Sequence, residues 1–177
     1  MTCIVGLMEK GKVYMGGDSA GVGHYDVTIR AEPKVFRKAL FVYGVCGSFR
    51  LINILHTKFV PPPIHTSNLY EYMATNFIDS LRSTLKDSGF ASKDDEVESM
   101  GHGSFMVGML GRLFHIGSDY QVGIPSDGYD AIGVADAYAL GSLYGSKGTP
   151  RKRVLLALQA AEKFNGAVRS PFVIERV

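Results

Sequence analysis

The sequence begins MTCIVG (residues 1–6), and two further short stretches, GGDS (residues 16–19) and EPKV (residues 32–35), follow it. An initiator Met before a small residue such as Thr2 is normally removable, so we expect Thr2 to become the first residue of the mature chain. A threonine there carries both a hydroxyl and a free α-amine, and the amine titrates near neutral pH. The amine can therefore act as base for its own hydroxyl, which makes the start of the chain a candidate catalytic site.

The spacing of Thr2, Asp18 and Lys34 resembles that of the catalytic threonine, aspartate and lysine in proteasome β-subunits and the bacterial HslV peptidase, which are N-terminal nucleophile (Ntn) hydrolases. The stretch YGVCGS (residues 43–48) is also similar, and in that family it donates a backbone N–H to the oxyanion. The resemblance implies a threonine peptidase. In such an enzyme the lysine ammonium lowers the proton affinity of the threonine hydroxyl, and the aspartate holds the lysine charged and oriented.

Each of these three residues also has an ordinary interpretation. Thr2 can be the first residue of a strand in a chain that keeps Met1. Asp18 can serve the turn that follows two glycines, and Lys34 can be one more surface cation. The three together, in order and at the right spacing, favour the catalytic interpretation.

Gly47 is the candidate oxyanion donor. A glycine between a strand and a helix lets the backbone approach a substrate closely, and N–H groups near a helix N-terminus suit a developing negative charge. A plain strand-to-helix turn would also select glycine, and Ser48 caps the helix in either case. The resemblance places Val45 in the pocket for the residue before the scissile bond, with Glu32 on its wall.

The C-terminal half departs from the family pattern. Val134 stands where the family has a serine that supports the N-terminal amine, and Asn165 and Val168 stand at the nearest register of its Asp-x-x-Ser pair. Two hydroxyls and one carboxylate are therefore missing around the amine. This supports an alternative function, a proteasome-like structural or scaffolding subunit that keeps the fold but has weak or no catalysis.

Hydrophobic periodicity predicts alternating blocks of strands and helices. We expect an irregular segment over 18–33 and a loop over 92–103. Two helices after each block of strands predict an α+β fold, a four-layer αββα sandwich formed by residues 1–177 as a single domain, which the resemblance also implies. The expected strands are 2–8, 12–17, 40–45, 104–110, 112–116 and 171–175, and the expected helices are 48–60, 68–87, 135–144 and 150–164.

Composition adds weaker constraints. With 177 residues, 46% of them hydrophobic, the chain has room for a full core. The net charge of +2 demands no polyanion, and we interpret the basic run from Lys147 to Arg153 as a solvated helix start rather than a nucleic-acid patch. Cys3 and Cys46 are too few for a disulfide framework. No signal peptide and no apolar run long enough to span a bilayer is present, so we expect a soluble cytoplasmic protein.

The five histidines show no ligand spacing and no nucleotide-binding glycine motif occurs, so we expect no metal site and no cofactor. Without an ATPase of its own, a peptidase of this kind would act on short or unfolded peptides, or with a separate ATP-dependent unfoldase. The resemblance also implies a homo-oligomeric ring. The wide apolar stripe of the helix over 68–87 is a further indication of a ring, although the stripe can equally be buried within one chain.

Overall fold

The computed structural model describes residues 1–94 and 97–177, and it is built from two antiparallel sheets. The first sheet has the order β12-β1-β2-β13, and the second has the order β11-β10-β9-β6-β5. The strands of the first sheet are Tyr129–Gly133, Cys3–Glu9, Lys12–Gly17 and Val173–Arg176 in that order. The strands of the second sheet are Val122–Gly123, Arg112–Ile116, Ser104–Met109, Phe41–Cys46 and Val35–Lys38 in that order.

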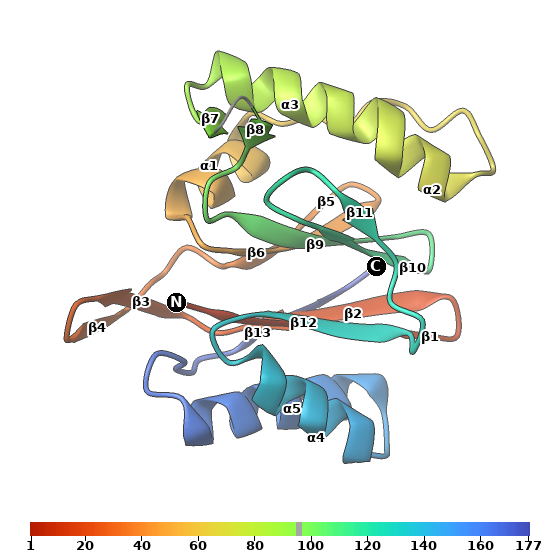
Figure 1. Ribbon diagram of the computed structural model, residues 1–177. Coiled ribbons are helices and arrows are strands. Elements are labelled where there is room, and N and C mark those ends of the chain that lie inside the picture. Colours follow the sequence, from red (N-terminus) through yellow and green to blue (C-terminus); the bar gives the residue numbers. More distant parts are fainter. Residues whose placement is uncertain (95–96) are drawn as a thin grey trace.

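Helices cover the outer face of each sheet, which gives four layers (Figure 1). A pair of helices, α4 and α5, lies against the first sheet, whereas α1 and a long helix formed by α2, η1 and α3 lie against the second. The predicted αββα sandwich is therefore confirmed. The helices are α1 (Phe49–Thr57), α2 (Leu69–Tyr72), η1 (Met73–Phe77), α3 (Ile78–Asp87), α4 (Asp136–Gly145) and α5 (Pro150–Phe164).

Three apolar clusters fill the three spaces between these layers. Alternation along β1 shows how one strand serves two of them, because Cys3 and Val5 join the cluster under α4 and α5 while Ile4 joins the cluster between the sheets. At two glycines the sheets come especially close. A Cβ at Gly108 would lie 2.6 Å from Val13 Cγ1, and one at Gly6 would lie 2.8 Å from Leu113 Cδ2.

The wide apolar stripe of the long helix is buried within the chain. Tyr72, Met73, Phe77 and Ile78 are buried in the cluster between this helix and the second sheet, and Leu69 packs against the same cluster. The stripe is thus explained without a neighbouring subunit. The helix begins at the expected position, where Asn68 Oδ1 accepts from Glu71 N at 3.2 Å, and a π-helical turn, η1, lies between α2 and α3.

Two expected irregular segments contain strands. Residues 18–33 include the hairpin of β3 (Ala20–Gly23) and β4 (Asp26–Ile29), which projects from the layers at the left of Figure 1. Residues 92–103 include the short strands β7 (Ser92–Asp94) and β8 (Val97–Ser99), while residues 95 and 96 of that prediction lie outside the described residues. Strands β5, β11 and β12 were also not predicted. β5 and β11 are short, with four and two residues, and β12 depends on pairing with β1 near the other end of the sequence.

Within the described residues, no helix combines the length and apolarity needed to cross a membrane. The same residues contain no group of three or more His, Cys, Asp or Glu side chains placed to hold a metal ion.

Candidate active site

The first sheet brings Thr2 and Asp18 together. Thr2 precedes β1 and Asp18 follows β2, and the register of these two strands pairs Ile4 with Gly17. Two hydrogen bonds extend this pairing to Asp18: its N–H donates to Cys3 O at 3.3 Å, and its Oδ1 accepts from Cys3 N at 3.0 Å. The carboxylate is therefore fixed beside the start of the chain by the hairpin itself.

Lys34 enters this site from the other sheet, one residue before β5. Its Nζ lies 2.9 Å from Asp18 Oδ1, and Asp18 Oδ2 accepts a further hydrogen bond from Ala20 N at 2.9 Å. The exposed fractions of the Lys34 and Asp18 side chains are 1% and 0%. A charge buried this deeply is costly unless it is paired and hydrogen-bonded, and both conditions hold here.

Burial lowers the pKa of the Lys34 ammonium below its ordinary value, and the neighbouring Asp18 carboxylate opposes that shift. The carboxylate therefore favours the charged ammonium in a place where water solvates it poorly. The pair concentrates a positive charge and its counter-ion next to the N-terminal residues.

The Met1 carbonyl is the point at which Lys34 and Thr2 meet. Thr2 Oγ1 donates to Met1 O at 2.5 Å, and Lys34 Nζ donates to the same oxygen at 3.4 Å. The Thr2 side chain is almost entirely buried. In this form of the chain the Thr2 nitrogen belongs to a peptide bond, so it is not a free amine.

A small pocket opens beside these residues, with a cavity volume of about 20 Å³, room for about one water molecule. Val45 belongs to its wall, and the Val45 N–H donates to Lys34 O at 3.0 Å, which ties β6 to the segment that carries the lysine. Apolar side chains from the first turns of α1 complete the wall. The lining residues are Met1, Thr2, Lys34, Val45, Cys46, Gly47, Ser48, Phe49 and Ile52.

Gly47 joins β6 to α1 in a conformation that excludes other residues. Its φ of +89° lies in the left-handed region, and a Cβ there would collide with the carbonyl of His102. Ser48 Oγ accepts from Leu51 N at 3.3 Å and caps α1, as predicted. The Gly47 backbone thus faces the pocket at the start of a helix.

Glu32 does not line this pocket. It is exposed, and its carboxylate forms an ion pair with Arg30 at 3.1 Å. The Arg30 guanidinium lies over the ring of Phe49, 4.5 Å from its centroid, and Phe49 is part of the pocket wall. Glu32 was expected on the wall, but it reaches the wall only through Arg30, which contacts Phe49.

On the side of Thr2 away from the pocket, the contacts are made by backbone atoms and an amide. Val134 N donates to Thr2 O at 3.0 Å, and Asn165 Nδ2 donates to Val134 O at 3.3 Å. Val168 is fully buried in the cluster under α4 and α5. The structure therefore brings Val134 and Asn165 next to Thr2, where neither supplies a hydroxyl.

The two cysteines face different surroundings. Cys3 packs under α4 and α5, and burial raises its pKa to about 12. Cys46 lines the pocket and lies 3.1 Å from Ser104 Oγ. The sequence did not predict that Cys46, Phe49 and Ile52 line the pocket. Small and apolar residues next to the start of a helix are ordinarily interpreted as core residues.

No protein-family model matches this sequence, and no curated protein is a detectable relative of it. Solved structures do match. BPH from Thiobacillus denitrificans superposes with a TM-score of 0.81 at 18% identity, covering 99% of this chain and 97% of that chain. HslV from Trypanosoma brucei superposes with a TM-score of 0.71 at 18% identity, covering 99% and 98%. An Anbu mutant from Hyphomicrobium sp. strain MC1 gives 0.68 at 18%, covering 99% and 82%. At this level of identity the likeness concerns the fold, and it shows that this chain has the HslV- and proteasome-like Ntn-hydrolase fold.

Proposed function

We propose that this protein is a threonine peptidase of the proteasome and HslV type, in which removal of Met1 exposes Thr2. The observation that carries the proposal is the buried Lys34–Asp18 pair, whose Nζ lies 3.4 Å from the carbonyl bonded to the Thr2 nitrogen. An ion pair at 1% and 0% exposure contributes little to stability compared with apolar side chains. A fold that keeps one beside an N-terminal threonine therefore has a use for a cation there.

In the proposed reaction the Thr2 hydroxyl oxygen attacks the scissile carbonyl carbon, and its proton passes to the Thr2 amine. The ammonium of Lys34 stabilises the developing alkoxide, and Asp18 keeps that ammonium charged. The carbon–nitrogen bond then breaks, and the amine returns the proton to the leaving group. Water attacks the resulting ester, the amine takes its proton, and the released Thr2 oxygen recovers a proton from the amine.

The residues around the pocket support the remaining proposed roles. The Gly47 N–H is the donor to the oxyanion, since Gly47 lies in the same pocket wall as Thr2 and Lys34. A substrate carbonyl held between Thr2 and Gly47 places the preceding side chain against Val45. The pocket wall is apolar there, with Phe49 and Ile52 beside it, so an apolar side chain is preferred.

The alternative function is a catalytically weak or inactive structural subunit. Val134 carries the specific observation in its favour, because it contacts Thr2 through its backbone and brings no hydroxyl to the amine. In both functions the chain assembles into a homo-oligomeric ring in the cytoplasm. The peptidase would take short or unfolded peptides, with an ATP-dependent unfoldase for folded substrates.

Two measurements separate these functions. Intact-mass spectrometry of the purified protein reports whether Met1 is present, and a fully retained Met1 leaves Thr2 without its amine and contradicts the peptidase proposal. Epoxomicin then tests the site, since a structure of Thiobacillus denitrificans BPH contains it. We expect one covalent adduct on the wild type, none on Thr2→Ala, and an unchanged adduct on the matched control Thr57→Ala. Loss of Met1 without any adduct would favour the structural subunit.

A further inference from the structure

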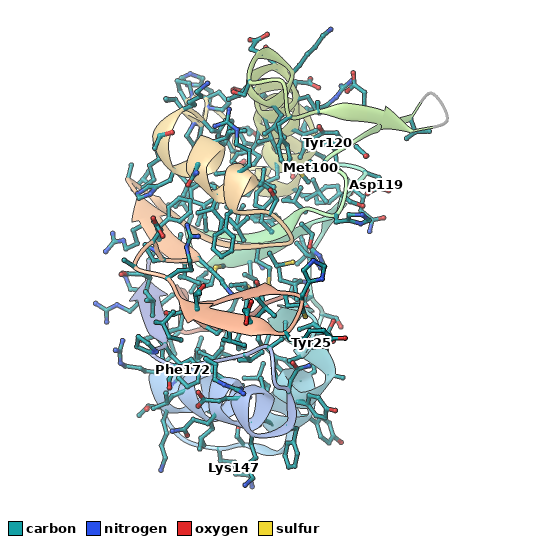
Figure 2. All side chains as sticks on the ribbon, turned by 90° about the vertical axis from the view of Figure 1, so that its left-hand side faces the viewer. Tyr25, Met100, Asp119, Tyr120, Lys147 and Phe172 are labelled. Carbon is teal, nitrogen blue, oxygen red and sulfur yellow. The ribbon has the colours of Figure 1, made fainter. Side chains whose placement is uncertain are left out.

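Six basic side chains gather at the end of the molecule opposite Thr2, and we call this group the basic end. Figure 1 shows the β1–β2 turn and the α4–α5 connection side by side at the right, away from the N-terminus, and Figure 2 shows Lys147 projecting into solvent at the lower tip. A hollow of about 490 Å³ separates the turn from residues 148–150, with Lys10, Lys12 and Tyr14 in its wall. The basic end comprises Lys10, Lys12, Lys147, Arg151, Lys152 and Arg153.

The distribution of charge makes this end distinct from the rest of the chain. The basic end holds six of the 19 Lys and Arg residues and, in Glu9, one of the 17 Asp and Glu residues, so its formal charge is +5. The remaining residues therefore sum to −3, although the whole chain is +2. A charge distribution of this kind attracts an acidic partner to the basic end.

None of the six cations takes part in an ion pair with another described residue. Arg151 and Arg153 do have hydrogen bonds, to the carbonyls of Ile174 and Leu143, and these tie the α5 start to its neighbours. Lys10, Lys147 and Lys152 are exposed and make no side-chain hydrogen bond within the described residues. Their charges are therefore available to a partner.

The position of three of these cations works against the local structure. Arg151, Lys152 and Arg153 lie in the first turn of α5, which contains no acidic residue. The helix dipole disfavours positive charge at that end of the helix. Arg151 and Arg153 are explained by the carbonyls of Ile174 and Leu143 that they bind, the second of them in the last turn of α4. Lys152 has no such contact within the described residues, and an anionic partner would offset its repulsion.

We propose that the basic end is a docking surface for an acidic segment of another protein, rich in Asp and Glu. The hollow fits a few side chains, and Lys10 and Lys12 lie in its wall. Lys152 lies beside Gly148 of the same wall, its Cδ 3.8 Å from the position of an added Cβ, and Lys147 precedes Gly148 in the chain. Nucleic acid fits less well, because tracking a phosphate backbone requires a long basic stripe, and beyond this end the chain is net negative. The Glu9 carboxylate in the wall repels a continuous phosphate backbone, whereas a partner with well-spaced charges can place a gap opposite it.

The experiment compares two triple charge reversals of equal net charge. Lys10→Glu/Lys147→Glu/Lys152→Glu removes the unpaired lysines of the basic end, and Lys58→Glu/Lys86→Glu/Lys163→Glu changes three exposed lysines elsewhere. The probe is a fluorescein-labelled peptide of alternating Asp and Glu, measured by anisotropy on the full chain at about 150 mM salt. We expect the first variant to lose at least about tenfold in affinity and the second to stay within about threefold of the wild type.

The melting temperature distinguishes loss of the docking surface from misfolding of the variant. Because Lys152→Glu places an anion in the first turn of a helix, the first variant should melt at the same temperature as the wild type or higher. Equal losses in both variants, or no peptide binding by the wild type, would overturn the proposal. A single-stranded oligonucleotide that binds the wild type more tightly than the peptide would assign the surface to nucleic acid instead. A fall in assembly mass confined to the first variant would assign it to a second copy of the chain.

Discussion

The contacts on the two sides of Thr2 differ in chemical type. Towards β2 and β5, charged side chains meet in the Asp18–Lys34 pair, which is fully buried and hydrogen-bonded. Towards β12 and α5, the contact is a backbone N–H from Val134, whose own carbonyl accepts from the Asn165 amide. The comparison teaches that backbone pairing holds Thr2 on one side, whereas on the other side Asp18 Oδ1 accepts from Cys3 N and Lys34 Nζ donates to Met1 O. The charged pair therefore contributes to position and also places a cation beside Thr2, which is open to a chemical explanation.

The largest effect should come from breaking the charged side. Lys34→Met leaves Asp18 buried without its cation, and we expect a loss of about 3–5 kcal/mol in the free energy of unfolding, measured by urea denaturation. Asp18→Asn/Lys34→Met should recover most of this loss, because no charge is then left unpaired. The same double variant should still fail to form the epoxomicin adduct, which separates stability from chemistry.

Lys86→Met is the matched control, an exposed lysine whose removal should change stability by less than about 0.5 kcal/mol. If the double variant were as unstable as Lys34→Met, the loss of stability in Lys34→Met would come from lost packing and not from an unpaired charge. If the double variant reacted with epoxomicin at the wild-type rate, Lys34 would have no part in the reaction.

The next effect concerns the strand-to-helix turn. Gly47→Ala forces a Cβ into the His102 carbonyl at a φ of +89°, and we expect a loss of about 2–4 kcal/mol together with loss of the adduct. Gly89→Ala separates the two causes, since Gly89 has a φ of +64° but no atom within 4 Å of the added Cβ. That variant should cost only about 1 kcal/mol. Equal costs would mean that the close approach at Gly47 is relaxed by small movements.

The hairpin on the charged side of the site was predictable from local sequence signals, whereas Lys34 was assigned through the family resemblance, because the strand beside it, β5, was not predicted. The β1–β2 hairpin follows from alternation and a turn, and it alone carries Asp18 back to the chain start. β12 was not predictable, since Tyr129–Gly133 is a short edge strand that depends on pairing with β1 across more than a hundred residues of sequence. Phe49 and Ile52 share that difficulty. Their apolar spacing predicts a packed helix face, and only the approach of β6 turns part of that face into a pocket wall.

A smaller effect should follow from adding what the backbone side lacks. Val134 is 49% exposed, so Val134→Ser should change the free energy of unfolding by less than about 0.5 kcal/mol. A hydroxyl beside Thr2 would give the free amine a hydrogen-bond partner, and we expect the epoxomicin adduct to form roughly threefold to tenfold faster. Val60→Ser, at another exposed valine, is the control and should leave the rate unchanged. No acceleration at Val134 would show that the missing hydroxyl does not limit the site.

The smallest effect distinguishes the two cysteines that flank Thr2. Burial, followed by the Asp18 carboxylate, raises the pKa of Cys3 from 9.0 to about 12, and burial also raises the pKa of Cys46, which its contact with Ser104 partly offsets. At pH 8 the thiolate fraction of native Cys3 is then about a thousandfold below that of an ordinary cysteine. Dithionitrobenzoate should therefore modify Cys46, which lines the pocket, before Cys3, and Cys3 only as fast as the protein opens.

The raised pKa values of the two thiols also determine whether the free energy of unfolding rises or falls with pH. Both thiols are protonated in the folded and unfolded chains well below pH 9, so they leave stability unchanged there. As pH rises from about 9, the unfolded chain loses these protons first, and the free energy of unfolding should decline towards pH 12. Cys3→Ala should lessen that decline, measured as the urea midpoint at successive pH values, although it lowers stability at every pH by leaving a small cavity. A decline of unchanged steepness in Cys3→Ala would mean that Cys3 is not the buried group responsible. It would leave Cys46 and the tyrosines Tyr43, Tyr72 and Tyr120, because burial raises the pKa of each of these groups as well.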